Sequence, residues 1–386
     1  GHGPPLATGG RAVTVLLEAL GIERPGGGRS ATLPLLEALF RRDPRTPYQL
    51  LLTRPEPRLA GFPNVQVRVV PLSRPLLARL WAEVALPVLA RRCRVRLVHH
   101  LKNLGVLWGG VPTVITLFDL GMLTHPDLFP WLDRWYWRRV QPWVLGRARR
   151  VVVISQATAE AVQRYYGLAA ERLAVIYPAH DRHFWPRPAA EVAVVRARYG
   201  LPADYLLYVG ALWEKKNTGV LLQAVERLHR QGVVRAPLVL VGGFYRKGRT
   251  APLRAAVARL ERAGVVRWLG AVPDADLPAL YSGARLFVFP SVIEGFGIAP
   301  LEALACGTPV VAAPVGALAE CLGEACWPVT EPHDPAALSE AIAHVYHAAE
   351  VRARLRAAGL AQAARFSYDR SAAALAQLYQ EVGDGR

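Results

Sequence analysis

Two successive series of short apolar runs constrain the fold of this chain more than any other feature of its sequence. The runs are rich in Val, Ile and Leu, and amphipathic stretches of helical length separate them. This alternation is typical of parallel strands covered by helices on both faces of a sheet. The sequence therefore predicts an α/β protein with two doubly wound parallel-sheet domains. The predicted strands are residues 12–17, 65–70, 95–99, 113–117 and 151–154 in the first series, and 205–209, 238–241, 267–269, 286–289 and 310–312 in the second.

Residues 178–188, which contain three prolines and no periodicity, separate the two series and are interpreted as a hinge. The N-terminal domain then covers residues 12–177 and the C-terminal domain residues 189–365, and a helix within residues 366–386 is expected to pack back on the N-terminal domain. Residues 1–11 begin with Gly-His-Gly, like the remnant of a processing step, and are expected to lie outside the fold. Doubly wound domains bind ligands beyond the carboxyl ends of their strands, so the active site is expected in the cleft between the domains.

The charge balance calls for an acidic partner, because the chain has a formal net charge of +17. Nucleic acid, anionic lipid and a phosphorylated substrate all satisfy this condition, and charge alone does not choose among them. The four cysteines have no metal-binding spacing, which favours reduced thiols and a cytoplasmic protein. No apolar run reaches the roughly 20 residues needed to cross a bilayer.

Residues 289–309 carry the most specific chemistry in the sequence. A buried strand ending at Phe289 leads into a glycine-rich turn and then into a helix predicted to start near Pro300. Free amides at residues 297–299 and the helix N-terminus together form a binding place for a phosphate. Glu294 and Glu302 flank it and would accept hydrogen bonds from sugar and ribose hydroxyl groups. The alternative is that Glu302 caps its helix and Glu294 is a solvated loop residue.

Two further loops follow predicted strands. Lys215 and Lys216 come directly after a buried strand that ends in glycine, although adjacent lysines in a loop are commonly just solvated. Gly27 and Gly28 belong to a glycine triplet after the first strand, which either lets the backbone approach a ligand or forms a flexible turn. The helix after this triplet is predicted to have Pro34 in its first turn.

These motifs together resemble the signature of family 4 of the retaining glycosyltransferases. The resemblance rests first on Glu-Gly-Phe-Gly at residues 294–297 and on Pro-Leu-Glu-Ala-Leu-Ala-Cys-Gly-Thr-Pro-Val-Val at residues 300–311. Residues 208–217, 266–284 and 151–158 resemble further segments of the family, and the similarity covers roughly residues 12–382. It implies the GT-B fold, in which two Rossmann-like domains face each other across a cleft.

The resemblance also implies a role for each matching residue. Lys216 would bind the donor diphosphate with help from Lys215, Glu294 would hold the transferred sugar, and Glu302 would hold the ribose. The catalytic residues are expected to be Lys216, Glu294 and Asp119. The expected donor-binding residues are Gly27, Gly28, Lys215, Lys216, Val272, Glu294, Phe296, Gly297, Ile298 and Glu302.

Residue 118 departs from the family pattern, which usually has His-Asp-Leu where this chain has Phe118-Asp119-Leu120. In relatives that histidine lies near the outer carbon of the donor sugar, and a phenylalanine cannot donate a hydrogen bond to a hydroxymethyl group. We therefore expect either a donor such as a 6-deoxy sugar or a pentose, or a shifted pocket; the alternative is that Phe118 only packs against apolar neighbours. Asp119 and His125 complete the expected sugar and acceptor pocket.

No metal and no cofactor are expected. The chain has no Asp-x-Asp pair in a suitable loop, and a fixed cation with backbone amides can neutralise the charge of a departing nucleoside diphosphate.

Residues 130–150 interleave Trp with Arg on predicted helices. This composition suits the headgroup boundary of an anionic membrane, which favours peripheral contact with the inner face. The same composition could stack on nucleic acid, or the helix could simply pack on the sheet.

The expected function is retaining transfer of a sugar from a nucleoside-diphosphate sugar, with GDP-mannose first and UDP sugars next, to a glycan, lipid-linked or small-molecule acceptor. Nucleic acid is not an expected partner. The rivals are a nucleotide-sugar epimerase of the same fold and a non-catalytic basic protein that binds nucleic acid or membrane. A phosphorylase would need a pyridoxal lysine in a context that the sequence lacks.

Overall fold

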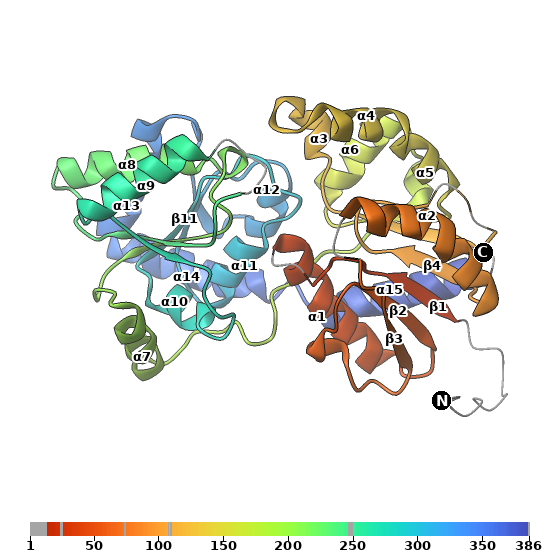
Figure 1. Ribbon diagram of the computed structural model, residues 1–386. Coiled ribbons are helices and arrows are strands. Elements are labelled where there is room, and N and C mark those ends of the chain that lie inside the picture. Colours follow the sequence, from red (N-terminus) through yellow and green to blue (C-terminus); the bar gives the residue numbers. More distant parts are fainter. Residues whose placement is uncertain are drawn as a thin grey trace.

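Two parallel sheets organise the chain into two domains (Figure 1). The computed structural model describes residues 14–23, 26–72, 75–106, 108, 110–245 and 250–384. The expectation for residues 1–11, and the start of the first predicted strand, lie outside these residues.

The N-terminal sheet has seven parallel strands in the order β3-β2-β1-β4-β5-β6-β7. In strand β1 (Val15–Glu18), Val15 and Leu17 enter a core that contains helix α1 (Gly27–Arg42), whereas Leu16 enters the core beneath helix α2 (Pro75–Arg92). The sheet is therefore covered on both faces, as the apolar runs predict. The strands are β1 (Val15–Glu18), β2 (Tyr48–Leu52), β3 (Val65–Val69), β4 (Leu97–His100), β5 (Thr113–Leu117), β6 (Arg150–Val153) and β7 (Leu173–Val175).

The C-terminal sheet has six parallel strands in the order β10-β9-β8-β11-β12-β13. The predicted fold class, with two Rossmann-like sheets, is confirmed. Sequence reasoning missed β2, which has no β-branched residue, and the three-residue strands β7 and β13, because pairing with a neighbour rather than local pattern makes them strands. The strands are β8 (Leu206–Val209), β9 (Leu238–Val241), β10 (Val266–Gly270), β11 (Leu286–Phe289), β12 (Val310–Ala312) and β13 (Cys326–Pro328).

Helices connect the strands in both domains. Those before the hinge are α1 (Gly27–Arg42), α2 (Pro75–Arg92), α3 (Gly121–Thr124), α4 (Trp131–Arg139), α5 (Gln141–Arg147) and α6 (Gln156–Tyr166). Those after it are α7 (Ala189–Tyr199), α8 (Thr218–Arg230), α9 (Ala251–Arg262), α10 (Leu277–Gly283), α11 (Ile298–Ala305), α12 (Ala317–Leu322), α13 (Pro335–His347), α14 (Ala349–Ala363) and α15 (Tyr368–Gly383). Short 3₁₀ turns lie at η1 (Pro57–Leu59), η2 (Pro126–Leu128), η3 (Ala170–Arg172) and η4 (Glu214–Lys216).

The last helix, α15, packs back on α1 of the N-terminal domain (Figure 1). The hydroxyl group of Tyr379 lies 2.5 Å from Nδ1 of the buried His99 on β4. The hydroxyl group of Tyr368 donates to the carbonyl oxygen of Ser30, at 2.9 Å. The end of the chain therefore belongs to the core of the domain in which the chain starts.

The start of α1 differs from the sequence prediction. The helix begins at Gly27, so Pro34 is its eighth residue and does not lie in the first turn. Gly26 precedes the helix with φ 142°, a conformation that glycine adopts without strain, and this allows the early start. Pro34 has no N–H to donate to the carbonyl of Ser30, and Tyr368 supplies that hydrogen bond instead. Similarly, α11 begins at Ile298, so Pro300 is its third residue and not its first.

A carboxylate from the C-terminal domain joins the two domains near the hinge. Glu320 on α12 accepts hydrogen bonds from the backbone N–H groups of Gln156 and Ala157, at 2.8 and 2.7 Å. These groups belong to the first turn of α6, where unpaired amides and the helix dipole favour a negative charge. Tyr177 also donates to Glu320, at 3.0 Å. The contact fixes how the carboxyl ends of the two sheets face each other.

Candidate active site

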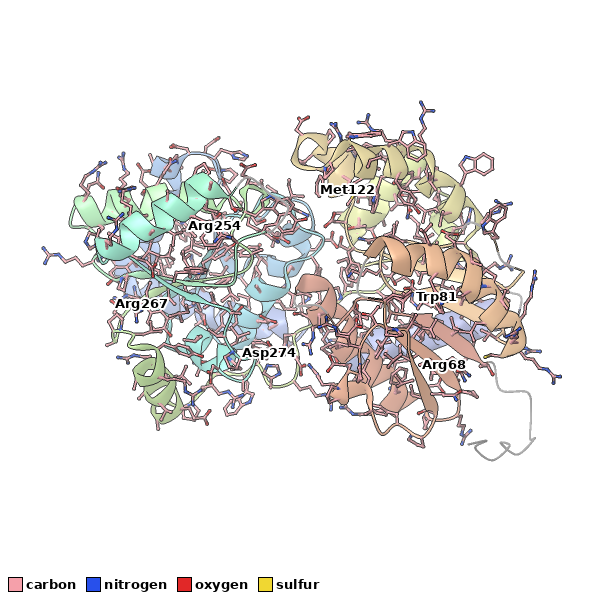
Figure 2. All side chains as sticks on the ribbon, viewed as in Figure 1. Arg68, Trp81, Met122, Arg254, Arg267 and Asp274 are labelled. Carbon is pink, nitrogen blue, oxygen red and sulfur yellow. The ribbon has the colours of Figure 1, made fainter. Side chains whose placement is uncertain are left out.

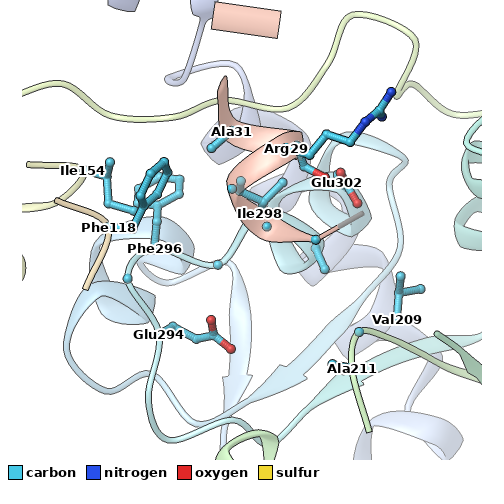
Figure 3. Close-up of a pocket in the computed structure, with 18 of the residues that line it drawn as sticks. Arg29, Ala31, Phe118, Ile154, Val209, Ala211, Glu294, Phe296, Ile298 and Glu302 are labelled. Atoms are coloured by element: carbon cyan, nitrogen blue, oxygen red, sulfur yellow. The ribbon is translucent and has the colours of Figure 1, made fainter. Parts of the chain in front are cut away.

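A cavity of about 530 Å³ lies between the two domains, and residues from both domains line it. Figure 3 shows Phe118, Ile154 and Phe296 together on one side, Val209 and Ala211 on the opposite side, and Glu294 pointing into the space between. The cleft between the carboxyl ends of the two sheets is thus the place where the predicted motifs meet.

Two helix N-termini line this cavity from opposite domains. Gly27 and Gly28 form the first turn of α1, and Ile298 and Ala299 form the first turn of α11. First-turn amides have no partner within their own helix, and the helix dipole adds partial positive charge. The predicted glycine loop is therefore a helix start, and two sets of first-turn amides from opposite domains line the same cavity.

Lys216 and Glu294 form an ion pair inside the cavity. Lys216 lies in η4, in the loop after β8, and Glu294 lies in the turn between β11 and α11. Their side chains are 20% and 11% exposed, respectively, and the Lys216 ammonium lies 5.6 Å from the centre of the Phe289 ring. Both side chains are thus paired and mostly buried, so neither residue is a merely solvated loop side chain.

Lys215 points to the other domain. Its ammonium nitrogen lies 3.0 Å from Oδ2 of Asp119, and the N–H of Gly121 donates to Oδ1 of the same carboxylate, at 2.9 Å. Burial by itself would raise the pKa of Asp119. The charge of Lys215 and the Gly121 hydrogen bond together lower it by more, so the pKa lies below its usual value. Asp119 therefore stays ionised and ties the domains together across the cavity.

Glu302 lies buried in the last part of α11, where it does not cap the helix N-terminus. The hydroxyl group of Tyr281 donates to its Oε2, at 2.9 Å. Burial raises the pKa of Glu302 to about 8, the Tyr281 hydrogen bond opposes this rise, and the negative charges of Asp274 and Asp181 add to it. A carboxyl group with this pKa is ready to exchange its proton for a hydrogen bond from a ligand hydroxyl group.

Phe118 lines the cavity, and its backbone contacts both domains. Its backbone N–H donates to Oδ1 of Asn103, at 2.7 Å. On the other side, a Cβ atom added to Gly295 would lie 2.0 Å from the Phe118 carbonyl oxygen. Only glycine fits at position 295, because the backbones of the two domains touch there.

Sequence reasoning missed a charged group on the opposite wall. Arg58 lies 2.6 Å from Asp181 of the hinge and 2.9 Å from Glu37 of α1. Arg29 contacts Asp274 of the C-terminal domain at 3.6 Å, and Figure 2 shows Asp274 on the side that faces the N-terminal domain. Burial raises the pKa of Asp181, but hydrogen bonds from His183 and Arg58 outweigh it and hold the pKa well below its usual range. No local motif marks these residues, and only their place in η1, α1 and the hinge brings them together.

Two predicted site residues lie elsewhere. Val272 does not line the cavity but packs against the C-terminal core. His125 is exposed beyond the cavity lining, at the end of α3, where its ring contacts the hydroxyl group of Thr124 at 2.9 Å. The remaining predicted site residues, Gly27, Gly28, Phe118, Asp119, Lys215, Lys216, Glu294, Phe296, Gly297, Ile298 and Glu302, all line it.

The described part of the chain shows no group of three or more His, Cys, Asp or Glu side chains placed to hold a metal ion. None of its described helices is long and apolar enough to cross a bilayer.

Comparison with known proteins identifies relatives of both domains. Residues 38–184 match the family model described as Glycosyltransferase Family 4, and residues 203–348 match that described as Glycosyl transferases group 1. O-antigen chain mannosyltransferase B of Escherichia coli is 35% identical over 257 residues, which cover 66% of this chain and 67% of that protein. A D-inositol 3-phosphate glycosyltransferase of Streptomyces bingchenggensis is 33% identical over 63% of this chain, and the match spans only 55% of that protein.

Solved structures share the whole architecture. HepE of Anabaena, in complex with UDP-glucose, has a TM-score of 0.77 and 22% identity over 95% of this chain and 99% of its own. WaaG, a glycosyltransferase involved in lipopolysaccharide biosynthesis, has a TM-score of 0.74 and 15% identity over 95% and 99% of the two chains. At this identity the likeness establishes the GT-B fold alone. Together with the E. coli relative and the matches on both domains, it shows that this chain belongs to family 4 of the glycosyltransferases.

Proposed function

We propose that this glycosyltransferase transfers mannose, or its 6-deoxy counterpart, from a nucleoside-diphosphate donor to a glycan or lipid-linked acceptor, with retention and without a metal ion. The observation that carries the proposal is the Lys216–Glu294 pair, which lines the same cavity as the N-termini of α1 and α11. A cation, two sets of free amides and a carboxylate are what a diphosphate attached to a sugar requires.

The donor diphosphate is proposed to lie against the first-turn amides of α11 and to attract the ammonium group of Lys216. Glu294, released from that ion pair, then accepts hydrogen bonds from the sugar hydroxyl groups, and Glu302 accepts them from the ribose. When the bond between the anomeric carbon and the phosphate oxygen breaks, negative charge grows on the diphosphate. Lys216 and the amides stabilise it in place, because they are already oriented before the reaction.

Retention is proposed through attack on the face from which the diphosphate leaves. The acceptor oxygen forms the new bond to the anomeric carbon, and its proton passes to the phosphate oxygen that departs with the nucleoside diphosphate. The roles of the two carboxylates support this route: Asp119 is paired with Lys215, and Glu294 is proposed to accept hydrogen bonds from the sugar hydroxyl groups. Neither is therefore held ready as a covalent nucleophile.

The choice of sugar rests on two observations. The E. coli relative at 35% identity is a mannosyltransferase, which favours GDP-mannose over a UDP sugar. Phe118, together with Ile154 and Phe296, forms an apolar wall that offers no hydrogen-bond donor side chain to an outer hydroxyl group (Figure 3). The wall favours the 6-deoxy form of the same sugar.

Thermal-shift screening against a panel of nucleotide sugars tests the proposal first. A donor present at about 100 times its dissociation constant adds about 2.7 kcal/mol of apparent stability. The product formed with the best donor should keep the anomeric configuration in its NMR spectrum, and a chelator should leave the rate unchanged. Conversion of the donor to another nucleotide sugar in the absence of an acceptor would instead indicate an epimerase.

We also propose peripheral contact with an anionic membrane through α4. Trp131 and Leu132 at its start are 65% and 58% exposed, and Arg138 and Arg139 are exposed at its end. Apolar side chains beside cations suit the headgroup boundary. The protein should sediment with vesicles that contain anionic lipid, and a Trp131→Ala/Leu132→Ala variant should sediment less. Equal sedimentation of both proteins would contradict the role of α4, and a salt-sensitive shift of random-sequence DNA would favour nucleic acid instead.

A further inference from the structure

The chain crosses between the two domains twice, and both crossings pack on the turn that precedes α11. Tyr177 leads into the hinge, and Phe366 lies between α14 of the C-terminal domain and α15, which packs on the N-terminal domain. The centre of the Phe296 ring lies 5.8 Å from that of Tyr177 and 5.2 Å from that of Phe366. Phe296 is 2% exposed and lines the donor cavity beside Ile154 (Figure 3). The three rings, here called the hinge cluster, thus join both crossings to a wall of the cavity.

The hydroxyl group of Tyr177 ties the hinge cluster to the carboxylate contact between the domains. It donates to Oε2 of Glu320 at 3.0 Å, and the same carboxylate accepts from the N–H groups of Gln156 and Ala157 in the first turn of α6. The Tyr177 carbonyl oxygen accepts from the hydroxyl group of Ser371 on α15, at 2.6 Å. Tyr177 is therefore fixed by its ring, its hydroxyl group and its backbone, and it contacts both domains.

Helix α12, which carries Glu320, also supports the turn before α11 directly. Figure 1 shows α12 on the side of its domain that faces α6, and the two helices contact each other. Leu318 and Cys321 are three residues apart and share the face of α12 that meets Gly297. A Cβ atom added to Gly297 would lie 2.5 Å from Cδ2 of Leu318, and the Cys321 thiol donates to the Gly297 carbonyl oxygen at 3.3 Å. One short helix therefore contacts the N-terminal domain through Glu320 and the turn through Leu318 and Cys321.

The conformation of this turn decides where the first-turn amides of α11 point. Gly297 immediately precedes α11 and has φ 107°, a conformation that glycine adopts readily and other residues do not. Phe296 is held by the hinge cluster, and Gly297 is held by α12. Groups that are oriented before a ligand arrives bind it more tightly, because binding then costs little ordering. Loss of the contact between Glu320 and α6 should therefore loosen the turn and weaken a ligand bound to its amides.

We propose that Tyr177 and Glu320 are positioning residues that couple donor binding to the contact between the domains. When Glu320 is bonded to α6 and to Tyr177, the turn is fixed with its amides toward the diphosphate, and when these bonds break, the turn relaxes. Coupling between two equilibria is reciprocal, so the bound donor must strengthen the Glu320 contact in return. Neither residue lines the donor cavity, so each acts through Phe296 or Gly297. This inference rests on the proposed function and describes how the same site is regulated.

Calorimetry of GDP binding tests the coupling in one direction. Tyr177→Phe keeps the ring and removes the hydroxyl group, and Glu320→Gln removes the charge at nearly constant volume. Each variant should bind GDP about fivefold more weakly, the effect expected for one hydrogen bond of about 1 kcal/mol. The double variant should lose less than the product of the two effects, because both changes break one contact. Wild-type affinity in both single variants would overturn the proposal, as would a double variant weakened by the full product.

Tyr346→Phe is the matched control. The hydroxyl group of Tyr346 also donates to a carboxylate, that of Asp204, but both residues belong to the C-terminal domain and lie outside the lining of the donor cavity. The GDP affinity of this variant should equal that of the wild type. A loss as large as that in Tyr177→Phe would show that any broken tyrosine–carboxylate bond has this effect, and would overturn the role of the hinge cluster.

Hydrogen exchange measured by NMR tests the coupling in the other direction. GDP should slow the exchange of the Gln156 and Ala157 amides, although these groups bond to Glu320 and do not line the donor cavity. At saturating GDP we expect at least threefold slower exchange in the wild type and in Tyr346→Phe, and no slowing in Glu320→Gln. A contact that served folding alone would not respond to the ligand. Equal exchange with and without GDP in the wild type would overturn the proposal.

The thermal shift produced by GDP separates this inference from the proposed function. A wild type that shows no shift would contradict the donor site itself, and the coupling with it. A normal shift, together with wild-type GDP affinity in Tyr177→Phe and Glu320→Gln, would contradict the coupling and leave the donor site intact.

Discussion

Lys215 and Asp119 connect the two domains across the active-site cavity, with 3.0 Å between the ammonium nitrogen and Oδ2 of the carboxylate. The Lys215 side chain is only 9% exposed, so removal of its partner leaves a nearly buried charge. We expect Asp119→Asn to weaken the contact between the domains by about 2 kcal/mol and to increase the radius of gyration of the donor-free protein in small-angle X-ray scattering. Asp204→Asn, which removes an ion pair with Arg285 inside the C-terminal domain, should leave that radius unchanged. An equal radius for Asp119→Asn and the wild type would show that the pair does not hold the domains.

Removal of either partner of the Lys216–Glu294 pair should stop transfer without unfolding the protein. Lys216→Ala and Glu294→Ala each remove a group that is proposed to act on the reacting donor, and we expect kcat to fall by about 10²- to 10³-fold. Initial rates at saturating donor measure the loss, and circular dichroism checks the fold. Glu226→Ala breaks an exposed ion pair with Arg259 and should keep its rate. Full turnover by both active-site variants would refute the site.

A methyl group at position 295 should separate the domains. In Gly295→Ala the new Cβ atom would meet the Phe118 carbonyl oxygen at 2.0 Å, and both are backbone positions that cannot rotate away. We expect transfer to fall at least 100-fold, since a misplacement of about 1 Å can cost that much. The control is Gly219→Ala in α8, where a Cβ atom meets nothing within 4 Å and should stabilise the helix by about 0.5–1 kcal/mol. Normal transfer by Gly295→Ala would mean that the two backbones do not touch in the active protein.

Binding of the nucleotide should release a proton from Glu302. Burial raises the pKa of this group from 4.5 to about 8, so it holds a proton at pH 7 in the free protein, whereas a carboxylate that accepts ribose hydrogen bonds does not. Calorimetry of GDP binding at pH 7 in phosphate and in Tris should therefore give different enthalpies, and Glu302→Gln should abolish the difference. Identical enthalpies for the wild type in both buffers would contradict this coupling.

The same shift in pKa sets the sign of a stability effect. A group whose pKa is higher in the folded than in the unfolded protein stabilises the fold below its unfolded value, here 4.5, and that stability is lost as the pH rises through about 8. The wild type should thus lose more stability than Glu302→Gln between pH 6 and pH 8.5 in denaturant titrations. An equal loss would show that the carboxyl group is not protonated in the folded state.

Phe118 should set the preference between a hexose donor and its 6-deoxy form. Phe118→His restores a side chain that can donate a hydrogen bond to an outer hydroxyl group, which is worth about 1 kcal/mol. We expect the ratio of kcat/KM for GDP-mannose to that for GDP-6-deoxymannose to rise by about fivefold. An unchanged ratio would mean that Phe118 only packs against Ile154 and Phe296.

The donor half of the site could be predicted from the sequence, because the residues that form it lie in short contiguous segments. The segment from Phe289 to Gly307 places a strand end, a helix start and two carboxylates within one short stretch, and Lys216 lies in the loop that follows β8. Parallel strands bring such stretches to one edge of a sheet. The sequence did not show that Val272 and His125 lie outside the cavity lining. Val272 follows a strand and packs against the C-terminal core, and His125 follows the end of α3, so tertiary packing decides where each side chain points.

The amino-acid sequence by itself determined the α/β class, the two sheets and the family, since these depend on periodicity and on motifs that are local in the chain. Only the tertiary structure decided which charges meet. Lys216 pairs with Glu294, Arg58 with Asp181 of the hinge, and Lys215 with Asp119 of the other domain. Such contacts join residues tens to more than a hundred positions apart, and they are fixed by how helices and sheets pack rather than by any local pattern.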